Sequence, residues 1–182
     1  MKISEIYAKL YTLLTKKTCI RVLKKKGLIV GKNINIQAGS IIDINHCFLI
    51  SIGDNCTLAP NCHILAHDAS TKKFINYTKI GRVSIGDNVF IGAGAIILPN
   101  VKIGNNVIIG AGSVVSKNVS DNCVVAGNPA KFINSLDDYL GRYNAISNDM
   151  KFDKSYTVAG GINEHKKSQM REKLNKGYGL IE

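Results

Sequence analysis

An aliphatic residue returns at every sixth position along much of this chain, and this spacing constrains the fold more than any other feature. One unbroken series runs from Ile85 to Val115, and two shorter series of three begin at Val30 and Ile52. Three places after nearly every aliphatic residue stands Asn or Gly. Self-similarity at so short a fixed period is typical of a solenoid of stacked repeats.

Each repeat predicts a short strand followed by a corner. The aliphatic residue and the residue two before it, such as Ile91 and Val89, are expected to point inward, which is the period of a strand with one buried face. Asn and Gly adopt positive φ at low cost, so their positions predict a left-handed backbone at the corners. These corner positions are Asn33, Gly39, Asn45, Asn55, Asn61, His67, Asn88, Gly94, Asn100, Asn106, Gly112 and Asn118.

The arrangement of the repeats predicts how the coils are built. Twelve repeats fall in blocks of three, three and six. If three repeats make one triangular coil, the chain forms a mainly β, parallel β-helix of about four or more coils whose strands stack roughly 4.7–4.9 Å apart. Both breaks between blocks then leave from the same edge of the prism.

Two segments resemble a known family of enzymes. The motifs VSIGDNVFIGAGAIILPNVKIGNNVIIGAGSVV and VVAGNPAKFI resemble the hexapeptide-repeat acyltransferases, in particular the sugar O-acetyltransferases such as the maltose and galactoside enzymes and those that modify capsular or surface polysaccharides. The resemblance covers roughly residues 28–134. It implies a left-handed parallel β-helix, a homotrimer, and acetyl-CoA as co-substrate, bound in grooves between subunits.

Appendages flank the hexapeptide-repeat domain, which we place at residues 28–134 with a loop at 67–79. Residues 1–27 read as an amphipathic basic helix, and residues 135–182 as a helical extension. In the extension, a capping pattern at Ser135 predicts a helix through about Ile146, and a second helix is expected near 163–176.

The positive charge is concentrated at the N-terminal end. Of the net +11, residues 1–27 carry +7, from eight Lys and Arg against one acid. The basic helix is expected to cap the open end of the solenoid, with peripheral contact to an anionic membrane as the alternative. No aromatic-basic surface accompanies the charge, which argues against a nucleic-acid partner.

The sequence also predicts where the protein is found. We expect a cytoplasmic protein, and the alternative is peripheral attachment to the inner face of the membrane through residues 1–27. No stretch is long and apolar enough to span a bilayer, and no signal peptide is apparent. Five cysteines show no CxxC spacing, so we expect reduced, structural thiols.

His67 is the residue that breaks the Asn/Gly series, and it opens the longest interruption, HDASTKKFINYTK. Acetyl transfer to a hydroxyl needs a general base, and the unperturbed pKa of histidine lies near neutrality. A lone loop histidine is ordinarily a surface residue. The resemblance, however, implies that a histidine at the start of such a loop is the catalytic base, and it assigns that role to His67.

His46 and Asp68 occupy positions, two before the next expected aliphatic residue, that are small or apolar in the other repeats. Both lie in third repeats of consecutive coils, so the three-repeat coil stacks them on one face. One hypothesis is that Asp68 or His46 orients His67 or contacts the acceptor. The alternative is that the chain has already left the coil and both face solvent.

His63, four residues before His67, raises the question of a metal. The γ-class carbonic anhydrases share this fold and bind zinc through histidines of neighbouring subunits, and such a site needs three ligands. His63 falls at a solvent-facing strand position and no third ligand is evident in a matching motif. We therefore expect no metal.

The resemblance also assigns residues to coenzyme A. They are Gly92, Ala93, Gly110, Ala111, Ser116, Lys117 and Lys131. The Gly-Ala corners match positions that touch the pantetheine arm, Ser116 and Lys117 match a pair near the adenine-phosphate end, and Lys131 matches a basic residue on the phosphates. The alternative for the two alanines is that they are ordinary corner residues.

These observations together predict an acetyl-CoA-dependent O-acetyltransferase that acts on a sugar hydroxyl of a surface or capsular polysaccharide or its precursor. His67 would be the general base, in a direct transfer within a ternary complex. Two alternatives remain open: N-acetylation of an amino sugar or an antibiotic, and a non-catalytic β-helix scaffold subunit.

Overall fold

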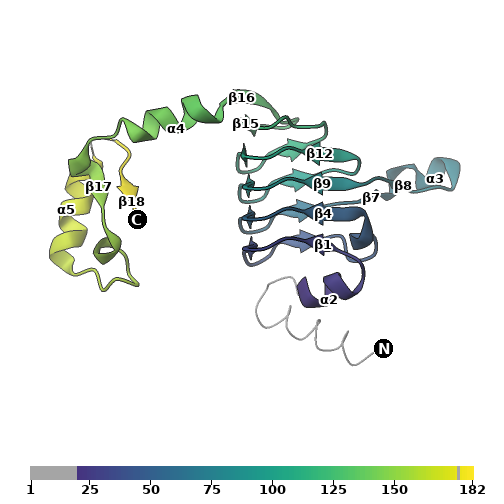
Figure 1. The fold of residues 1–182 in the computed structure, drawn as a ribbon, viewed down its shortest axis with the longest axis horizontal. Coiled ribbons are helices and arrows are strands. Elements are labelled where there is room, and N and C mark those ends of the chain that lie inside the picture. Colours follow the sequence, from purple (N-terminus) through teal and green to yellow (C-terminus); the bar gives the residue numbers. More distant parts are fainter. Residues whose placement is uncertain (1–19, 176) are drawn as a thin grey trace. The chain divides into compact units, whose positions relative to one another are not determined.

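The computed structural model describes residues 20–175 and 177–182. The described residues divide into two compact units, one up to Leu136 and one from Asp137 to Glu182. Of the predicted N-terminal helix, the described part contains α2 (Ile20–Lys25), and the prediction for residues 1–19 lies outside the described residues. Leu23 of α2 is 3% exposed and belongs to the hydrophobic core, at the end of the solenoid that begins with β1 (Figure 1).

Three parallel sheets form the body of the first unit (Figure 1). The first sheet has the order β1 (Ile29–Val30), β4 (Ile50–Ile52), β9 (Val83–Ile85), β12 (Val101–Ile103). The second has β2 (Asn35–Ile36), β5 (Thr57–Leu58), β10 (Phe90–Ile91), β13 (Val107–Ile109), β15 (Cys123–Ala126) and then the antiparallel β16 (Lys131–Ser135). The third has β3 (Ile41–Ile42), β6 (His63–Ile64), β11 (Ile96–Ile97), β14 (Val114–Val115).

The chain therefore visits each sheet once per turn, and we call three such consecutive strands a rung. The predicted mainly β, parallel solenoid is confirmed by these strand pairings. Inside the solenoid, the aliphatic residues of the six-residue repeats stack on one another. Ile42, Ile64 and Ile97, for example, are fully buried one above the next. Each burial contributes roughly 1.5–3 kcal/mol, and no rung could supply this alone.

Most of the predicted corners have the left-handed backbone. Asn88 has φ 56° and Asn106 also 56°, and their side-chain amides are joined by a hydrogen bond of 2.9 Å. Three of the twelve corner positions differ from the prediction, because Asn45, His67 and Asn118 are not among the positive-φ residues. The backbone N–H of Asn45 instead bonds to the Asp43 carboxylate, and the side chain of Asn118 accepts from the Lys102 N–H.

Both interruptions of the repeat leave from one corner, between the third and first sheets, which we call the insertion edge. The first, after β3, contains η1 (Cys47–Leu49). The second, after β6, is an arm of β7 (His67–Asp68), η2 (Ala69–Thr71), α3 (Lys72–Ile75) and β8 (Lys79–Ile80), which projects from the sheets in Figure 1. The prediction that the two loops share an edge is thus correct, because β3 stacks on β6 and β4 on β9.

Helix α4 (Leu136–Asn144) begins at the last residue of the first unit, and its remainder belongs to the second. The second unit also contains η3 (Asn148–Met150), β17 (Lys151–Phe152), η4 (Lys154–Tyr156), α5 (Glu164–Leu174) and β18 (Leu180–Ile181). Ser135 ends β16, and α4 stops two residues before the expected Ile146. Asn163 caps α5 by accepting from the Lys166 N–H at 2.9 Å. Within residues 20–175 and 177–182, no helix has the length and apolarity needed to cross a membrane.

Candidate active site

His67 and Asp43 meet at the insertion edge. His67 begins β7, directly after the second rung, and Asp43 follows β3 in the rung before it. The Nδ1 atom of His67 is hydrogen-bonded to Oδ2 of Asp43, whose side chain is 1% exposed, whereas that of His67 is 37% exposed. Because an ionised carboxylate only accepts, the proton of the neutral imidazole lies on Nδ1. Nε2 is left as the basic nitrogen.

The Asp43 carboxylate is held by three further donors. Oδ1 accepts from the N–H groups of Asn45 and His46, both at 3.1 Å, and Oδ2 accepts from the Ala66 N–H at 3.2 Å. Burial alone would raise the pKa of Asp43. The hydrogen bonds from His67, His46 and Ala66 outweigh it, so the pKa of this carboxyl lies below its usual value and Asp43 is ionised at neutral pH.

Asp43 is the site residue that the sequence analysis missed. It occupies the position directly after the inward aliphatic residue, where the other third-sheet strands are followed by Leu65, Leu98 and Ser116. Among the twelve repeats it is the one acid at that position. A carboxylate directly after an inward aliphatic residue and just before an interruption was the available signal.

His46 also lies at this edge. Its ring centroid is 4.8 Å from that of His67, and its Nδ1 is 3.6 Å from Oδ1 of Asp43. That Nδ1 is buried and has no hydrogen-bond partner among the described residues. The structure thus brings His46, predicted beside the site, together with His67.

Asp68 has its partners within the arm. Its carboxylate pairs with Lys79 Nζ at 2.6 Å and accepts from the Ser70 N–H at 2.8 Å. The Lys79 ammonium and the Ser70 donors lower the pKa of Asp68 to about 2. The hypothesis that Asp68 orients His67 is therefore wrong in this structure, because the chain has left the coil and pairs with β8. The carboxylate that contacts His67 is that of Asp43.

The residues assigned to coenzyme A lie at two different edges. Gly92 and Ala93 follow β10, and Gly110 and Ala111 follow β13, at the corner between the second and third sheets. Ser116 and Lys117 follow β14 at the insertion edge, two rungs beyond the rung that leads into His67, or about 10 Å along the stack. Lys131 begins β16. One subunit does not gather all seven residues.

The two glycines at the corner between the second and third sheets, Gly92 and Gly110, are required by the stacking of the rungs. A Cβ on Gly92 would lie 2.5 Å from the Ala111 nitrogen, and one on Gly110 would lie 2.8 Å from the Ala126 Cβ. The Gly92 N–H already bonds to the Ile109 carbonyl at 2.8 Å. Among the described residues, the N–H of Ala93 at the same corner has no backbone acceptor.

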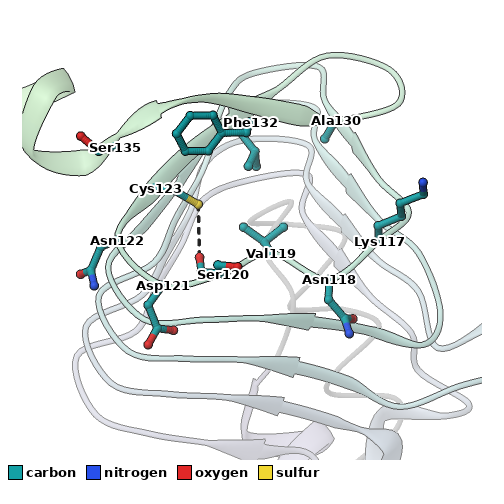
Figure 2. Close-up of a pocket in the computed structure, with 11 residues that line it drawn as sticks. Lys117, Asn118, Val119, Ser120, Asp121, Asn122, Cys123, Ala130, Phe132 and Ser135 are labelled. Carbon is teal, nitrogen blue, oxygen red and sulfur yellow. Dashed lines mark hydrogen bonds between the residues drawn. The ribbon is translucent and has the colours of Figure 1, made fainter.

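A pocket of about 410 Å³ lies at the end of the solenoid that follows β14. Figure 2 shows Val119 and Phe132 facing it, with Lys117 at its rim and pointing outward. Lys117 is the one residue assigned to coenzyme A that lines this pocket, and His67 is not among its lining residues.

His63 lies on the outer side of the third sheet, in register with Ile41 below and Ile96 above. It does not join the Asp43, His46 and His67 group. The four described cysteines, Cys47, Cys56, Cys62 and Cys123, are buried, and burial raises the pKa of each thiol. These cysteines are structural residues.

Comparisons with known proteins agree with the repeat architecture. The family model described as bacterial transferase hexapeptide (six repeats) matches residues 82–117. The chain is also 32% identical to a maltose O-acetyltransferase from Clostridium difficile 630, over 71% of this chain and 84% of that one, with a TM-score of 0.52. The chain belongs to the hexapeptide-repeat transferase family. Membership implies the left-handed form of the parallel β-helix.

Two more relatives extend this comparison. Protein CapG of Staphylococcus aureus is 47% identical over 96 residues, which are 50% of this chain and 56% of CapG. The chain thus spans somewhat more than half of the length of this curated relative. A hexapeptide-repeat acetyltransferase from Vibrio cholerae, solved with acetyl coenzyme A, is 26% identical over 61% of each chain, with a TM-score of 0.55.

Proposed function

We propose that the protein is an acetyl-CoA-dependent O-acetyltransferase that acts on a sugar hydroxyl, in a surface or capsular polysaccharide or its precursor. The observation that carries the proposal is the buried, ionised Asp43 bonded to Nδ1 of the partly exposed His67. The similarity to a maltose O-acetyltransferase and to an acetyltransferase solved with acetyl coenzyme A supports the substrate classes.

The proposed reaction is a direct transfer. Nε2 of His67 takes the hydroxyl proton while the hydroxyl oxygen attacks the thioester carbonyl carbon. The tetrahedral intermediate collapses, the C–S bond breaks, and the imidazolium returns the proton to the coenzyme A thiolate. Asp43 holds the ring orientation and stabilises the imidazolium, as the carboxylate does in a Ser-His-Asp triad. The buried thiols leave no cysteine among the described residues as a covalent nucleophile.

The Ala93 N–H is the candidate donor for the oxyanion. It lies at an exposed corner of the stack and has no backbone acceptor among the described residues. A fixed backbone donor aimed at developing negative charge is worth about 10²–10³ in rate.

A homotrimer would bring the two edges together. His67 and Lys117 lie at one edge of a subunit and Ala93 at another, so a groove between neighbours can combine them although one subunit cannot. The outer face of the third sheet supports such a contact, because three of the four residues in its stacked column, Ile41, Ile96 and Val114, are aliphatic, with His63 between Ile41 and Ile96. Of these, Ile41 is 45% exposed in the single chain.

The arm is the candidate acceptor-binding segment. It begins at His67, so whatever binds beside Nε2 also meets the arm. Its tip exposes aromatic side chains, with Phe74 85% and Tyr77 75% exposed, beside the cations Lys72 and Lys73. Aromatic faces and charged groups are suited to packing against sugar rings and anionic glycans.

Thiol release from acetyl-CoA tests the proposal, measured across hydroxyl sugars, amino sugars and polysaccharide fragments with wild type beside His67→Ala. We expect release with a hydroxyl sugar, and a loss of about 10²–10⁴ in kcat in the variant. Release confined to amino sugars would favour N-acetylation. No release with any acceptor, together with no binding of acetyl-CoA by calorimetry, would favour a scaffold.

A further inference from the structure

Three metal-ligating side chains converge at the insertion edge. Asp43, His46 and His67 each offer one ligand atom, and these atoms all lie within 4.8 Å of one another. His46 and His67 come from two separate interruptions of the repeat, and Asp43 begins the first of them. Their convergence depends on the stacking of two rungs, so it is a property of the fold.

We propose that Asp43, His46 and His67 form a binding site for a divalent transition-metal ion of the zinc class, and that the bound ion switches off the base. Two imidazoles and one carboxylate suit such an ion, since zinc in proteins takes nitrogen and carboxylate ligands and keeps a fourth position open when three are protein groups.

The His46 ring supplies the observation that the acetyl-transfer mechanism does not use. Its Nδ1 is buried, has no hydrogen-bond partner among the described residues, and lies 3.6 Å from Oδ1 of Asp43. Ligand atoms about 2.0–2.2 Å from a tetrahedral zinc lie roughly 3.3–3.5 Å from each other. The separation of these two atoms therefore fits a metal ion between them better than a direct hydrogen bond.

The carboxylate is already oriented for such a role. The N–H groups of Asn45, His46 and Ala66 hold it from the protein side, at 3.1–3.2 Å. Ligating carboxylates are ordinarily hydrogen-bonded in this way, which fixes the direction of their remaining lone pairs. The ion would replace the proton between His67 and Asp43, and the His67 ring would shift outward to make room for it.

The consequence for the base follows from the two ring nitrogens. Coordination through Nδ1 uses the lone pair of that atom, so the ring proton must lie on Nε2. Nε2 is the nitrogen that has to accept the hydroxyl proton, and in this state it cannot. This inhibitory part rests on the proposed function, whereas the binding of the ion does not.

Binding is tested on the metal-free full-length protein, titrated with Zn²⁺ by calorimetry and with Co²⁺ by visible absorption. We expect one ion per chain in wild type, and an affinity weaker by about tenfold or more in His46→Gln. His165→Gln, a histidine of helix α5 in the second unit, is the matched control and should bind like wild type. Circular dichroism and Tm show that each variant is folded.

Several outcomes would overturn the site. These are no saturable Zn²⁺ binding, equal affinity in His46→Gln and wild type, or equal losses in His46→Gln and His165→Gln. For the switch, Zn²⁺ is titrated into the thiol-release assay and then removed with a chelator. Loss and recovery of activity support the switch, and full activity with the site occupied overturns it. A protein with no basal activity contradicts the proposed function, while the calorimetric titration still decides the site.

Discussion

His67 is hydrogen-bonded through Nδ1 to Oδ2 of Asp43, a carboxylate twenty-four positions earlier in the chain and one rung away in the solenoid. The bond places the proton of the neutral imidazole on Nδ1 and leaves Nε2 as the basic nitrogen of a side chain that is 37% exposed. The stacking of two rungs thereby brings together a base and its positioning group, which lie at two separate interruptions of the repeat.

Asp43→Asn is expected to lower kcat by about 10²–10⁴, because an amide cannot hold the imidazole in the correct tautomer or stabilise its charged form. Thiol-release kinetics measure this. Asp87→Asn is the matched control and should keep its activity. Oδ1 of Asp87 accepts the Asp54 N–H at 2.7 Å, and in the next rung Oδ1 of Asn105 accepts the Asp87 N–H at 2.8 Å, so an asparagine already fills the equivalent position. A variant at Asp43 with wild-type kcat would contradict the role of the carboxylate.

Acid should destabilise the protein partly through Asp43. Its pKa is lower in the folded chain than the usual value, so its contribution to stability is present above about pH 4 and is lost as the pH falls below that. We expect Asp43→Asn to be less stable than wild type at pH 7 by about 2–3 kcal/mol, because three backbone donors lose an ionised acceptor. Urea unfolding from pH 7 to pH 3 measures this. The difference between the two proteins should shrink toward pH 3, and a constant difference would argue against it.

The Asp68–Lys79 pair should be visible as a shifted titration. Carboxyl-carbon NMR is expected to place the pKa of Asp68 at about 2, since the Lys79 ammonium and the Ser70 donors stabilise its ionised form. In Lys79→Met the midpoint should rise toward the ordinary value of about 3.9. Lys73→Met, in the same arm but without an ion pair in the described structure, is the control. An unchanged midpoint in Lys79→Met would show that the pair does not form in solution.

The column of corner asparagines should contribute measurably to stability. Asn88 accepts from Asn55 at 3.1 Å and donates to Asn106 at 2.9 Å, at φ 56°. Asn88→Gly keeps the backbone conformation and loses both bonds, so we expect a loss of about 1–2 kcal/mol. Asn88→Ala adds the left-handed strain of a residue with a Cβ, about 1 kcal/mol more.

Chemical denaturation measures both variants, and Asn100→Gly provides their control. Asn100 has φ 66° but no amide bond to another corner in the described structure, so its replacement by Gly should change stability little. Equal losses in Asn88→Gly and Asn100→Gly would attribute the effect to the glycine alone.

The sequence was sufficient for the features that repeat. The hexad period predicted the solenoid, Asn and Gly predicted positive φ at corners such as Asn33 and Gly94, and the block sizes placed both interruptions at one edge. These features are local, because each depends on the backbone preferences and burial of a few consecutive residues. The prediction of positive φ at Asn45 was wrong, because its N–H bonds to the Asp43 carboxylate and its corner belongs to that turn and not to the repeat.

The partners of the site residues depended on the tertiary structure. The repeat pattern was enough to show that His67 interrupts the series at an edge of the prism. Only the stacking of rungs decided that Asp43 and His46 meet it, that Asp68 turns to Lys79, and that Ala93 and Lys117 lie at separate edges. The physical reason is that contacts between rungs are set by register and by interruptions of unequal length, which a six-residue period does not encode.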